Sequence, residues 1–323
     1  MKLLVTGGAG FIGSAFVRNV LGDSFGLRAQ RVTVLDALTY AGNLHNLRSI
    51  SSDERFFFVH GNITDKHLVG KLVAEADVVI NFAAESHVDN SLHSAIDFVE
   101  TNVVGTTTIL EALRANPGRR LIQISTDEVY GPIRSGESRE FDILNPSSPY
   151  SASKASADLL CMSYFHTFGV DVVITRCSNN YGPFQFPEKM IPRFISNILM
   201  GKPIPIYGSG ENIREWIHVD DHCMGIRLVL EGGRSGTIYN IGSDERRSNL
   251  NLAHALLDLL NHDNSLISYV TDRPGHDIRY ALDSRKIREE LGFATTVDFS
   301  DGLRSTVEWY SRNLDWWQPL IQN

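Results

Sequence analysis

A glycine-rich turn near the amino terminus constrains the fold of this chain most strongly. The residues Gly8-Ala9-Gly10-Phe11-Ile12-Gly13 follow a short apolar run at 3–5 and begin a stretch with helical spacing at 11–21, and Gly7 adds a further glycine. Glycines let a backbone approach a pyrophosphate, and a helix N-terminus presents free N–H groups and the positive end of its dipole. A strand, this turn and a helix favour a dinucleotide-binding site, although a tight turn without a ligand would use the same glycines.

Asp36 has the spacing of the carboxylate that a dinucleotide-binding site requires. Asp36 ends the next apolar run, at 32–35, and lies about 20 residues beyond the glycine turn, the usual spacing for this fingerprint. A carboxylate there accepts a hydrogen bond from the ribose 2′-hydroxyl of NAD and repels the 2′-phosphate of NADP. We therefore expect NAD as the cofactor. The alternative is that Asp36 is an ordinary helix cap or turn residue.

Strand-like and helix-like segments alternate through the first half of the chain. The strand-like runs are short and mostly lack polar alternation, which is typical of strands buried on both faces of a parallel sheet. Their alternation with helical segments predicts an α/β fold with a doubly wound parallel sheet of the Rossmann type. The expected strands lie at 3–5, 32–35, 56–59, 78–84, 121–124 and 170–174, and the expected helices at 11–21, 92–113 and 151–168.

The pattern changes after residue 176. Five prolines interrupt short elements between 183 and 205, and helical spacing returns at 221–230, 249–260 and 303–309. We interpret this part as a second, smaller mixed α/β lobe. The expected domains are a Rossmann domain at 1–176 and this second lobe mainly at 177–323. Because no composition shift marks a linker, we expect the two to interleave, with about 205–242 returning to the first domain.

Charge and cysteine content exclude several classes of function. Lys and Arg number 30 against 38 Asp and Glu, a net charge of −8, so the chain lacks the basic footprint of a nucleic-acid-binding protein. Cys161, Cys177 and Cys223 lie far apart without CxxC spacing, which argues against a disulfide framework and a thiolate zinc site. The first residues are too short an apolar run for a signal-peptide core, and no run is long enough to span a membrane. We expect a cytoplasmic protein without nucleic-acid or membrane partners.

A tyrosine and a lysine are spaced for shared chemistry. In Tyr150-Ser151-Ala152-Ser153-Lys154 the two side chains are four residues apart, so on a helix they project from one face. An adjacent ammonium lowers the pKa of a phenol, which would let Tyr150 take a proton from a sugar hydroxyl while hydride leaves the same carbon. The pair also arises by chance, so its weight depends on its place in the fold.

Polar residues follow directly on the strand expected at 121–124. Ser125, Thr126, Asp127 and Glu128 therefore lie at the sheet edge where doubly wound folds collect ligand-binding groups. The Thr126 hydroxyl could position the reacting oxygen. An alcohol dehydrogenase needs no further acid and base, whereas eliminating water from a sugar needs both. The two adjacent carboxyl groups therefore suggest that one acts as the acid and the other as the base. An exposed acidic turn is the alternative.

These residues occur with three further motifs, and together they resemble one enzyme family. The motifs are Leu38-Thr39-Tyr40-Ala41-Gly42-Asn43, Ala83-Ala84-Glu85-Ser86-His87-Val88-Asp89 and Arg273-Pro274-Gly275-His276-Asp277. They closely resemble dTDP-glucose 4,6-dehydratases, which belong to the extended short-chain dehydrogenase/reductase superfamily. The glycine turn and the Tyr-Lys pair are typical of the superfamily, Thr-Asp-Glu of sugar dehydratases, and Thr-Tyr-Ala-Gly-Asn of the dTDP-glucose branch. The similarity runs from Leu3 to the region of Tyr280.

The resemblance implies a redox-neutral lyase reaction. Tyr150, with Lys154 beside it, would remove the proton of the C4 hydroxyl as NAD takes the C4 hydride. Glu128 would then take the acidified C5 proton, and Asp127 would protonate the departing C6 hydroxyl. Return of the hydride to C6 would give dTDP-4-keto-6-deoxyglucose. A cofactor regenerated within each turnover should be held tightly.

The resemblance also implies the two binding sites. Dehydratases usually carry Asp where this chain has Asn62, whose amide oxygen can still accept from the adenine amino group without a full charge. The implied NAD site comprises Gly7, Gly10, Phe11, Ile12, Gly13, Asp36, Leu38, Thr39, Asn62, Ile63, Phe82, Ala83, Ala84, Ser86, Thr101, Tyr150, Lys154 and Asn180. The resemblance implies that the second lobe, mainly at 177–323, is the substrate-binding lobe. The implied substrate site comprises Ser86, Thr126, Asn179, Lys189, Met190, Pro205, Ile206, Tyr207, Arg214, Asn249, Arg273 and His276, with 205–207 beside the nucleotide base.

Other functions remain open at this point. A UDP-glucose 4,6-dehydratase and a nucleotide-sugar 4-epimerase share the fold, and a catalytically silent NAD-binding scaffold is an alternative of a different class. Asp127 and Glu128 argue against the epimerase, which needs no second acid–base pair. The resemblance further implies a homodimer paired through 92–113 and 151–168.

Some residues invite functional readings that we do not favour. His218, Asp220, Asp221 and His222 could be drawn as a metal cluster, but we interpret them as a strand end, an Asp helix cap and a helix start, with no metal bound. Four aromatic residues near the carboxyl terminus are expected to pack in a core rather than stack on a ligand: Trp309, Tyr310, Trp316 and Trp317.

Overall fold

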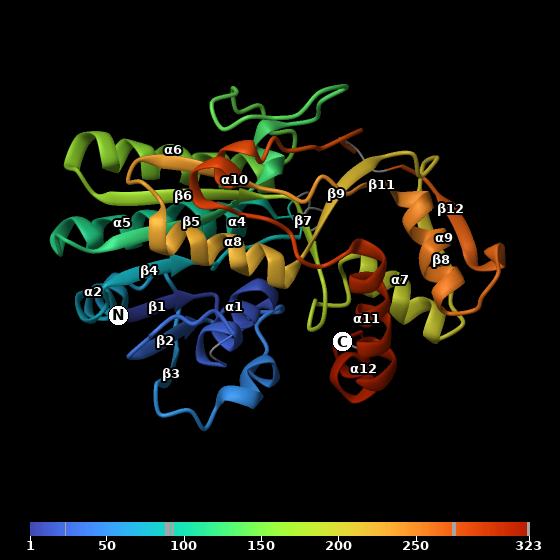
Figure 1. Ribbon diagram of the computed structural model, residues 1–323, viewed down its shortest axis with the longest axis horizontal. Coiled ribbons are helices and arrows are strands. Elements are labelled where there is room, and N and C mark those ends of the chain that lie inside the picture. Colours follow the sequence, from blue (N-terminus) through green and yellow to red (C-terminus); the bar gives the residue numbers. More distant parts are fainter. Residues whose placement is uncertain (23, 88–90, 92–93, 273–275, 322–323) are drawn as a thin grey trace.

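Seven parallel strands form one twisted sheet in the larger of two lobes (Figure 1). The computed structural model describes residues 1–22, 24–87, 91, 94–272 and 276–321. In that part of the chain the strand order is β10-β6-β5-β4-β1-β2-β3. The strands are β1 (Lys2–Thr6), β2 (Arg31–Asp36), β3 (Phe56–His60), β4 (Val78–Asn81), β5 (Arg120–Thr126), β6 (Asp171–Cys177) and β10 (Thr237–Ile241). The order reverses at β1, and such a reversal places ligand-binding groups beyond the carboxyl ends of the strands. The predicted Rossmann-type sheet is confirmed.

Burial explains why most of these strands lack polar alternation. Two apolar clusters cover the two faces of the sheet, so residues pointing in either direction are buried. β3 is different because it lies at the edge of the sheet, and Phe57 is 42% exposed. The expectation of burial on both faces is wrong for this strand. The run expected at 78–84 also ends earlier as a strand, at Asn81, and continues as a loop.

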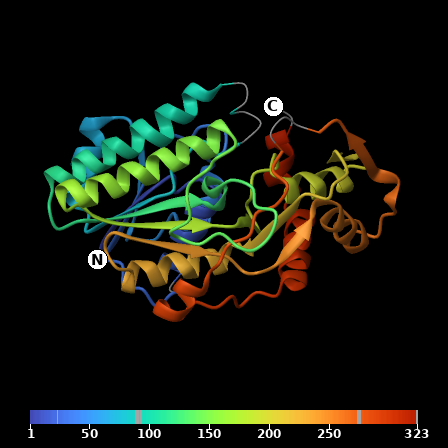
Figure 2. The same ribbon diagram turned by 90° about the horizontal axis from the view of Figure 1, so that it is seen from above.

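Helices cover both faces of the sheet (Figure 2). One face carries α2 (Lys66–Glu75), α5 (Thr106–Ala115) and α6 (Pro149–Phe168), and the other carries α1 (Phe11–Leu21), α8 (Val219–Gly232) and α10 (Arg285–Leu291). Two short 3₁₀ turns complete the lobe, η1 (Leu44–Ile50) and η3 (Asp127–Tyr130). The apolar stripes of these helices supply the side chains that bury the sheet.

The helix expected at 92–113 is not continuous. It consists of α4 (Ala95–Phe98), the π-helical turn η2 (Val99–Gly105) and α5, while Leu92 and His93 lie outside the described residues. Asn102, inside η2, is buried, and its Nδ2 donates to Ser153 Oγ at 2.8 Å and to the Glu85 carbonyl oxygen at 3.0 Å. π-turns are frequent at functional sites, and this one carries Thr101 to the cavity described below.

The smaller lobe is mixed α/β, as expected. One sheet has the order β11-β9-β7 and the other pairs β12 with β8. Its elements are β7 (Asn179–Tyr181), α7 (Met190–Leu199), β8 (Ile204–Tyr207), β9 (Ile213–His218), β11 (Arg246–Ser248), α9 (Asn249–Leu259), η4 (Asn264–Leu266), β12 (Ile267–Val270), α11 (Phe299–Arg312) and α12 (Leu314–Ile321). Tyr310 and Trp317 are fully buried in its core, and Trp309 and Trp316 pack against Phe184. The four aromatic residues therefore pack as predicted.

The two lobes interleave in sequence. Within the stretch 205–242, α8 and β10 lie with the seven-stranded sheet, whereas β8 and β9 belong to the smaller sheets. The chain leaves the large lobe after β10 and returns to it again at α10. The assignment of all of 205–242 to the first domain is therefore wrong for its first two strands, because strand pairing with β7, β11 and β12 holds them in the small lobe.

The residues of the suspected metal cluster make structural contacts instead, and His222 Nδ1 lies 2.8 Å from Asn180 Oδ1. The N-cap of α8 is His218, whose Nδ1 accepts from the Asp220 N–H at 3.3 Å, and not an aspartate as expected. Asp221 accepts from the backbone N–H groups of Thr296 and Val297. Among the described residues, no group of three or more His, Cys, Asp or Glu side chains lies close enough together to hold a metal ion.

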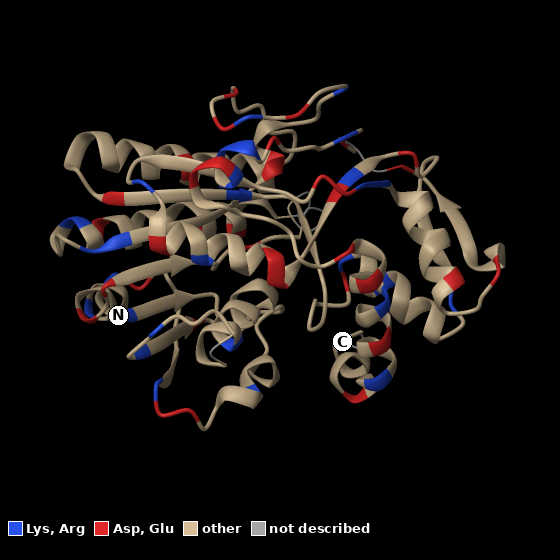
Figure 3. Ribbon diagram, viewed as in Figure 1, with Lys and Arg blue, Asp and Glu red and all other residues tan. Residues whose placement is uncertain are grey.

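Acidic and basic residues are interspersed along the ribbons of both lobes (Figure 3). Along the described helices and strands, Lys and Arg do not form a continuous basic stripe of the kind that tracks a phosphate backbone. None of the described helices is both long and apolar enough to cross a membrane.

Candidate active site

A deep cavity opens at the carboxyl edge of the seven-stranded sheet, where the two lobes meet. Its wall takes in the glycine turn after β1, Asp36 at the end of β2, residues 82–86 after β4, and residues 124–128 at the end of β5. Tyr150 and Lys154 from α6 and residues 185, 186 and 188–190 from the small lobe complete it. Every residue of the expected NAD site except Leu38 lines this cavity, as do all five expected catalytic residues.

The glycine turn approaches the loop after β4 too closely for any side chain. Gly7 has a φ of +68°, and a Cβ there would lie 2.5 Å from the backbone nitrogen of Ala83. A Cβ on Gly13 would lie 2.4 Å from the Gly7 carbonyl oxygen. No side chain caps α1 at Gly10, so the first N–H groups of the helix have no side-chain acceptor there. This cradle fits a pyrophosphate at the N-terminus of an eleven-residue helix.

Asp36 is fixed by the backbone around it. The N–H groups of Ala9 and Leu38 each donate to one of its carboxylate oxygens, at 2.8 Å. Burial raises the pKa of Asp36, and these two hydrogen bonds oppose the shift because they favour the charged form. Leu38 itself does not line the cavity. Its backbone supports Asp36 instead, with a φ of 51° that a leucine rarely adopts.

The β5 end positions two carboxyl groups in different environments. Thr126 Oγ1 accepts from the Glu128 N–H at 3.3 Å and donates to Asp127 Oδ1 at 3.2 Å. Asp127 is 3% exposed, and its Oδ2 has no partner among the described groups. Burial raises the pKa of Asp127 well above its usual range, and Glu128 and Glu215 add to the shift. Asp127 is therefore suited to give a proton, beside a half-buried Glu128.

The start of α6 sets the positions of Tyr150 and Lys154. Ser148 caps the helix, its Oγ accepting from the Ser151 N–H at 3.1 Å, and Pro149 occupies the first turn. Lys154 Nζ donates to the Ile124 carbonyl oxygen at 2.6 Å, and burial lowers the pKa of this lysine.

The expected lowering of the tyrosine pKa is not found in the protein alone. Burial raises the pKa of Tyr150 well above 10, and Glu128 adds to the shift, whereas a hydrogen bond with Thr126 opposes it. The reason is that the Lys154 ammonium is directed to Ile124, while the phenol is removed from water. An oxidised nicotinamide would bring a positive charge into the same cavity.

A second cavity continues from the first into the small lobe. The residues common to both walls are Ser86, Glu128, Asn179, Glu188, Lys189 and Met190. The Lys189 ammonium donates to the Ser86 carbonyl oxygen at 2.7 Å and so ties the small lobe to the loop after β4. Of the other expected substrate residues that the structure describes, Thr126 lines only the first cavity, and six line the second: Pro205, Ile206, Tyr207, Arg214, Asn249 and His276. Arg273 lies outside the described residues.

Two features of this second cavity suit a nucleoside diphosphate sugar. Arg214 is 4% exposed, and its guanidinium carbon lies 4.8 Å from the centre of the Tyr280 ring. Asn249 Oδ1 is buried without a partner among the described groups. A planar guanidinium can donate two hydrogen bonds to a diphosphate, and an unpartnered amide oxygen calls for a donor from a ligand.

Sequence reasoning missed several residues of these walls. Ser178 Oγ and Gln185 Oε1 are buried without partners and belong to residues that line the first cavity. Ser178 follows β6 as Asp127 follows β5, so its position at the sheet edge could have indicated it. Gln185 stands in a loop whose path the sequence does not specify. The other unexpected residues include Cys177, Phe186, Glu188, Trp216, Arg193 and Tyr280.

Comparisons with known proteins agree with this geometry. A family model described as GDP-mannose 4,6 dehydratase matches residues 4–306. A dTDP-glucose 4,6-dehydratase from Streptomyces niveus is 51% identical over 321 residues, which cover 99% of this chain and 96% of the relative.

Two solved structures extend the likeness to three dimensions. The dTDP-glucose 4,6-dehydratase of Streptomyces venezuelae, with NAD and TYD bound, matches with a TM-score of 0.98 at 53% identity, covering 99% of this chain and 100% of that one. The dTDP-glucose 4,6-dehydratase of Bacillus anthracis, in complex with NAD, matches with a TM-score of 0.92 at 45% identity, covering 99% of both chains.

Proposed function

Because this chain belongs to the family of nucleotide-sugar 4,6-dehydratases, we propose that it uses NAD to convert dTDP-glucose into dTDP-4-keto-6-deoxyglucose and water. The observation that carries the proposal is the pair of unlike carboxyl groups at the end of β5. Asp127 is buried with a raised pKa, Glu128 is half-buried, and both line the same cavity as Tyr150. Elimination of water across C5 and C6 needs one acid and one base at neighbouring atoms.

The residues of the first cavity have separable roles in this reaction. When bound, NAD supplies the hydride acceptor for C4 and the hydride donor for C6. Tyr150 takes the proton of the C4 hydroxyl, and Thr126 positions that oxygen. Lys154 fixes α6 against β5 through its contact with the Ile124 carbonyl oxygen. Walls contributed by both lobes exclude water from the reacting atoms.

The carboxyl groups then complete the elimination. The C4 ketone acidifies the C5 proton, which Glu128 takes. Asp127 gives its proton to the C6 hydroxyl, which leaves as water. Addition of hydride at C6 and a proton at C5 gives the product, so the reaction has no net redox change. The cradle formed by Gly7, Gly10 and Gly13 holds the cofactor between turnovers.

Incubation with dTDP-glucose and, separately, with UDP-glucose tests the proposal. Mass spectrometry of the sugar nucleotide should show the loss of one water from dTDP-glucose, without added NADH and with little conversion of UDP-glucose. Unchanged mass with a new C4 configuration would instead identify a 4-epimerase. No conversion of either substrate by NAD-loaded protein would support a binding scaffold.

We also propose that the protein works as a cytoplasmic homodimer. Four apolar side chains on the neighbouring elements α4, η2 and α6 are strongly exposed, namely Ile96 (62%), Val99 (43%), Val104 (45%) and Leu159 (61%). Such a concentration of exposed apolar groups suits contact with a second copy. The three cysteines are all unpaired, which suits a reducing compartment.

Light scattering after size-exclusion chromatography tests the dimer. The protein should elute with twice the mass of one chain, and Ile96→Asp combined with Leu159→Asp should give monomers that keep their bound NAD. A monomeric parent protein would contradict this part of the proposal. Cell fractionation with an antibody tests the compartment.

A further inference from the structure

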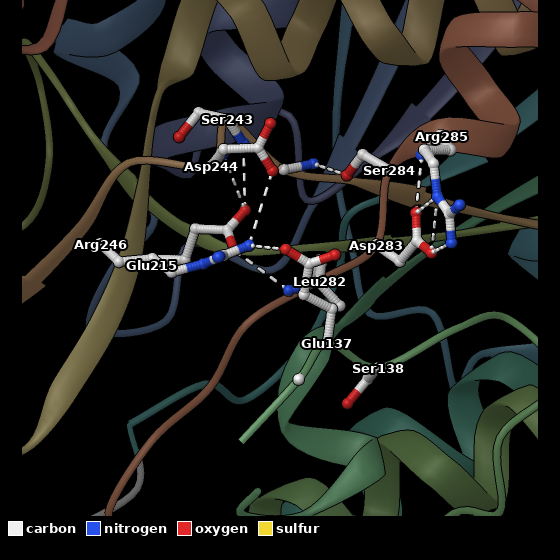
Figure 4. A network of polar contacts seen from close by, with 12 residues as sticks. Glu137, Ser138, Glu215, Ser243, Asp244, Arg246, Leu282, Asp283, Ser284 and Arg285 are labelled. Carbon is white, nitrogen blue, oxygen red and sulfur yellow. Dashed lines mark hydrogen bonds and ion pairs between the residues drawn. The ribbon is translucent and has the colours of Figure 1, made fainter. Parts of the chain in front are cut away.

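One buried carboxylate joins the segments that cross between the lobes (Figure 4). Glu215 lies on β9 and is fully buried. Its Oε1 accepts from the N–H groups of Ser243 and Asp244, at 3.1 and 3.3 Å. Its Oε2 accepts from Arg246 Nε at 3.2 Å and from the Leu282 N–H at 3.0 Å. All four partners are donors, so the charged carboxylate satisfies each of them without a proton.

The backbone N–H groups that donate to Glu215 come from both segments in which the chain passes between the lobes. We call these two segments the crossings. Residues 242–245 lead from β10 in the large lobe to β11 in the small lobe, and residues 282–284 lead back to α10 in the large lobe. The first crossing packs directly on the carboxylate, because a Cβ on Gly242 would lie 2.1 Å from Glu215 Oε1. The Gly242 N–H donates to Ser284 Oγ at 2.8 Å, which ties one crossing to the other.

A second arm of the network leads to the catalytic turn. Tyr130, the last residue of η3, donates from its hydroxyl to Asn240 Oδ1 at 2.8 Å. Asn240 Nδ2 in turn donates to the carbonyl oxygens of Ser138 and Asp283, at 2.9 and 3.3 Å. The turn that carries Asp127 and Glu128 is therefore anchored to the same crossings that Glu215 holds.

Glu215 is also the neighbour of a residue in the substrate cavity. Arg214 precedes it on β9 and lines the second cavity, so the two side chains leave opposite faces of the strand. A shift of β9 against the crossings would move Arg214 relative to Asp127. Proper elimination needs both residues in place, since a misplacement of about 1 Å can cost about a hundredfold in rate.

We propose that Glu215 is a positioning residue for the dehydration: its buried carboxylate holds the two lobe crossings together and thereby fixes Arg214 and Asp127 on their respective walls of the substrate cavity. The inference rests on the proposed function. Glu215 touches neither substrate nor cofactor, because it lines neither of the two cavities. It acts through its neighbours.

Glu215 also acts on Asp127 through its charge. The titratable and charged groups that face Asp127 are Glu128 on its own turn, Arg214 and Glu215 on β9, Tyr150 on α6 and Cys177 on β6. Glu128 and Glu215 raise the pKa of Asp127, and Arg214 lowers it. The charge of Glu215 therefore helps to keep the catalytic acid protonated.

Two variants separate the contacts from the charge. Glu215→Gln keeps the size of the side chain but turns an amide NH₂ towards donors that need an acceptor, so the contacts on one side are lost together with the charge. Glu215→Asp keeps the charge and shortens the side chain, so only the contacts are weakened. Glu137→Gln is the matched control, because Glu137 Oε1 contacts Arg246 Nη2 at 2.6 Å at the exposed end of the network.

The measurements are KM for dTDP-glucose, kcat as a function of pH, and bound NAD per chain. Glu215→Gln should raise KM about tenfold and move the alkaline limb of kcat to lower pH by about one unit, since a negative charge near Asp127 has been removed. Glu215→Asp should raise KM without shifting the alkaline limb of the pH profile of kcat. Both variants should keep their NAD, and Glu137→Gln should behave as the parent protein.

Three outcomes would overturn the inference. A Glu215→Gln protein with the parent KM and the parent pH profile would exclude it, as would an equal loss in Glu137→Gln. Should Glu215→Gln fail to accumulate as folded, NAD-containing protein, an unchanged KM in Glu215→Asp would exclude it. Failure of the parent protein to dehydrate dTDP-glucose would instead contradict the proposed function and is seen before any variant is made.

Discussion

The ammonium of Lys154 contacts the carbonyl oxygen of Ile124, with Nζ and O 2.6 Å apart, so the second turn of α6 is fastened to the end of β5. Thr126, Asp127 and Glu128 follow Ile124 directly, and Tyr150 precedes Lys154 by one helical turn. The contact therefore fixes the position of the Tyr150 phenol relative to the carboxyl groups of Asp127 and Glu128. In the protein without bound ligands, Lys154 therefore fixes the position of Tyr150, whereas burial is the largest influence on the pKa of the phenol.

Replacing Tyr150 by phenylalanine removes the group that we propose as the base for the first step. We expect Tyr150→Phe to keep its fold and its NAD, because the ring still packs against Phe98, with the two ring centres 6.2 Å apart. Its kcat should fall by about 10²–10⁴, the usual contribution of a positioned base. The measurement is product formation by mass spectrometry together with absorbance of reduced cofactor. Appreciable product at the parent rate would exclude Tyr150 as the base.

Replacing each of the two carboxyl groups by its amide should stop the reaction at a different step. Glu128→Gln should accumulate 4-keto sugar with reduced cofactor and exchange no C5 proton with deuterated water, because the base is gone. Asp127→Asn should exchange the C5 proton yet lose little water, because the acid for the C6 hydroxyl is gone. Mass spectrometry in deuterated water distinguishes them. Identical behaviour of the two variants would contradict the division of roles.

The oxidation step should speed up as the pH rises. Burial raises the pKa of Tyr150 above 10, so the phenolate fraction is small at neutral pH and grows as the pH approaches that pKa. In the Glu128→Gln background, the rate at which reduced cofactor forms should therefore increase from about pH 6 to about pH 9. Stopped-flow absorbance measures it. A flat profile would mean that substrate and NAD together bring the phenol pKa below this range.

A charged residue at position 62 should tighten NAD binding. Asn62 Oδ1 accepts from the N–H and hydroxyl of Thr64, both at 3.0 Å, and the residue lines the cofactor cavity. Asn62→Asp keeps these contacts and gives the adenine amino group a charged acceptor, so the dissociation constant for NAD should fall by up to about tenfold. Calorimetry on protein stripped of cofactor measures it. Weaker binding would show that residue 62 does not contact the adenine.

The buried ion pair of Asp158 and Arg176 should contribute more to the free energy of unfolding than an exposed ion pair does. Asp158 Oδ2 and Arg176 Nε are 2.9 Å apart, with the two side chains 1% and 3% exposed. Asp158→Ala leaves an unpaired guanidinium in the core and should lower the free energy of unfolding by about 3–5 kcal/mol. Glu308→Ala breaks the exposed pair with Arg312 and should cost less than about 1 kcal/mol. Urea unfolding compares them, and equal losses would contradict the argument.

The sequence supported the assignment of the cofactor lobe because local signals coincided there. The glycine turn, the Asp36 spacing and the buried runs each restrict the backbone over a few residues, so they could be read without knowing what lies opposite. The same holds for Tyr150 and Lys154, whose shared face follows from helical spacing. β3 and the interrupted helix at 92–113 were misjudged because sheet position and a long-range contact of Asn102 with Ser153 decided them.

What the sequence by itself determined is therefore the parallel sheet, the dinucleotide turn and the set of residues that we propose as the reacting groups, since these depend on short spacings and on side-chain chemistry. Only the tertiary structure decided that Asp127 is buried beside a half-exposed Glu128, that Gln185 belongs to the cavity, and that Glu215 joins both lobe crossings. Burial and contacts between residues far apart in the chain set these properties, because the dielectric around a carboxyl group and the donors within its reach exist only once the lobes have packed.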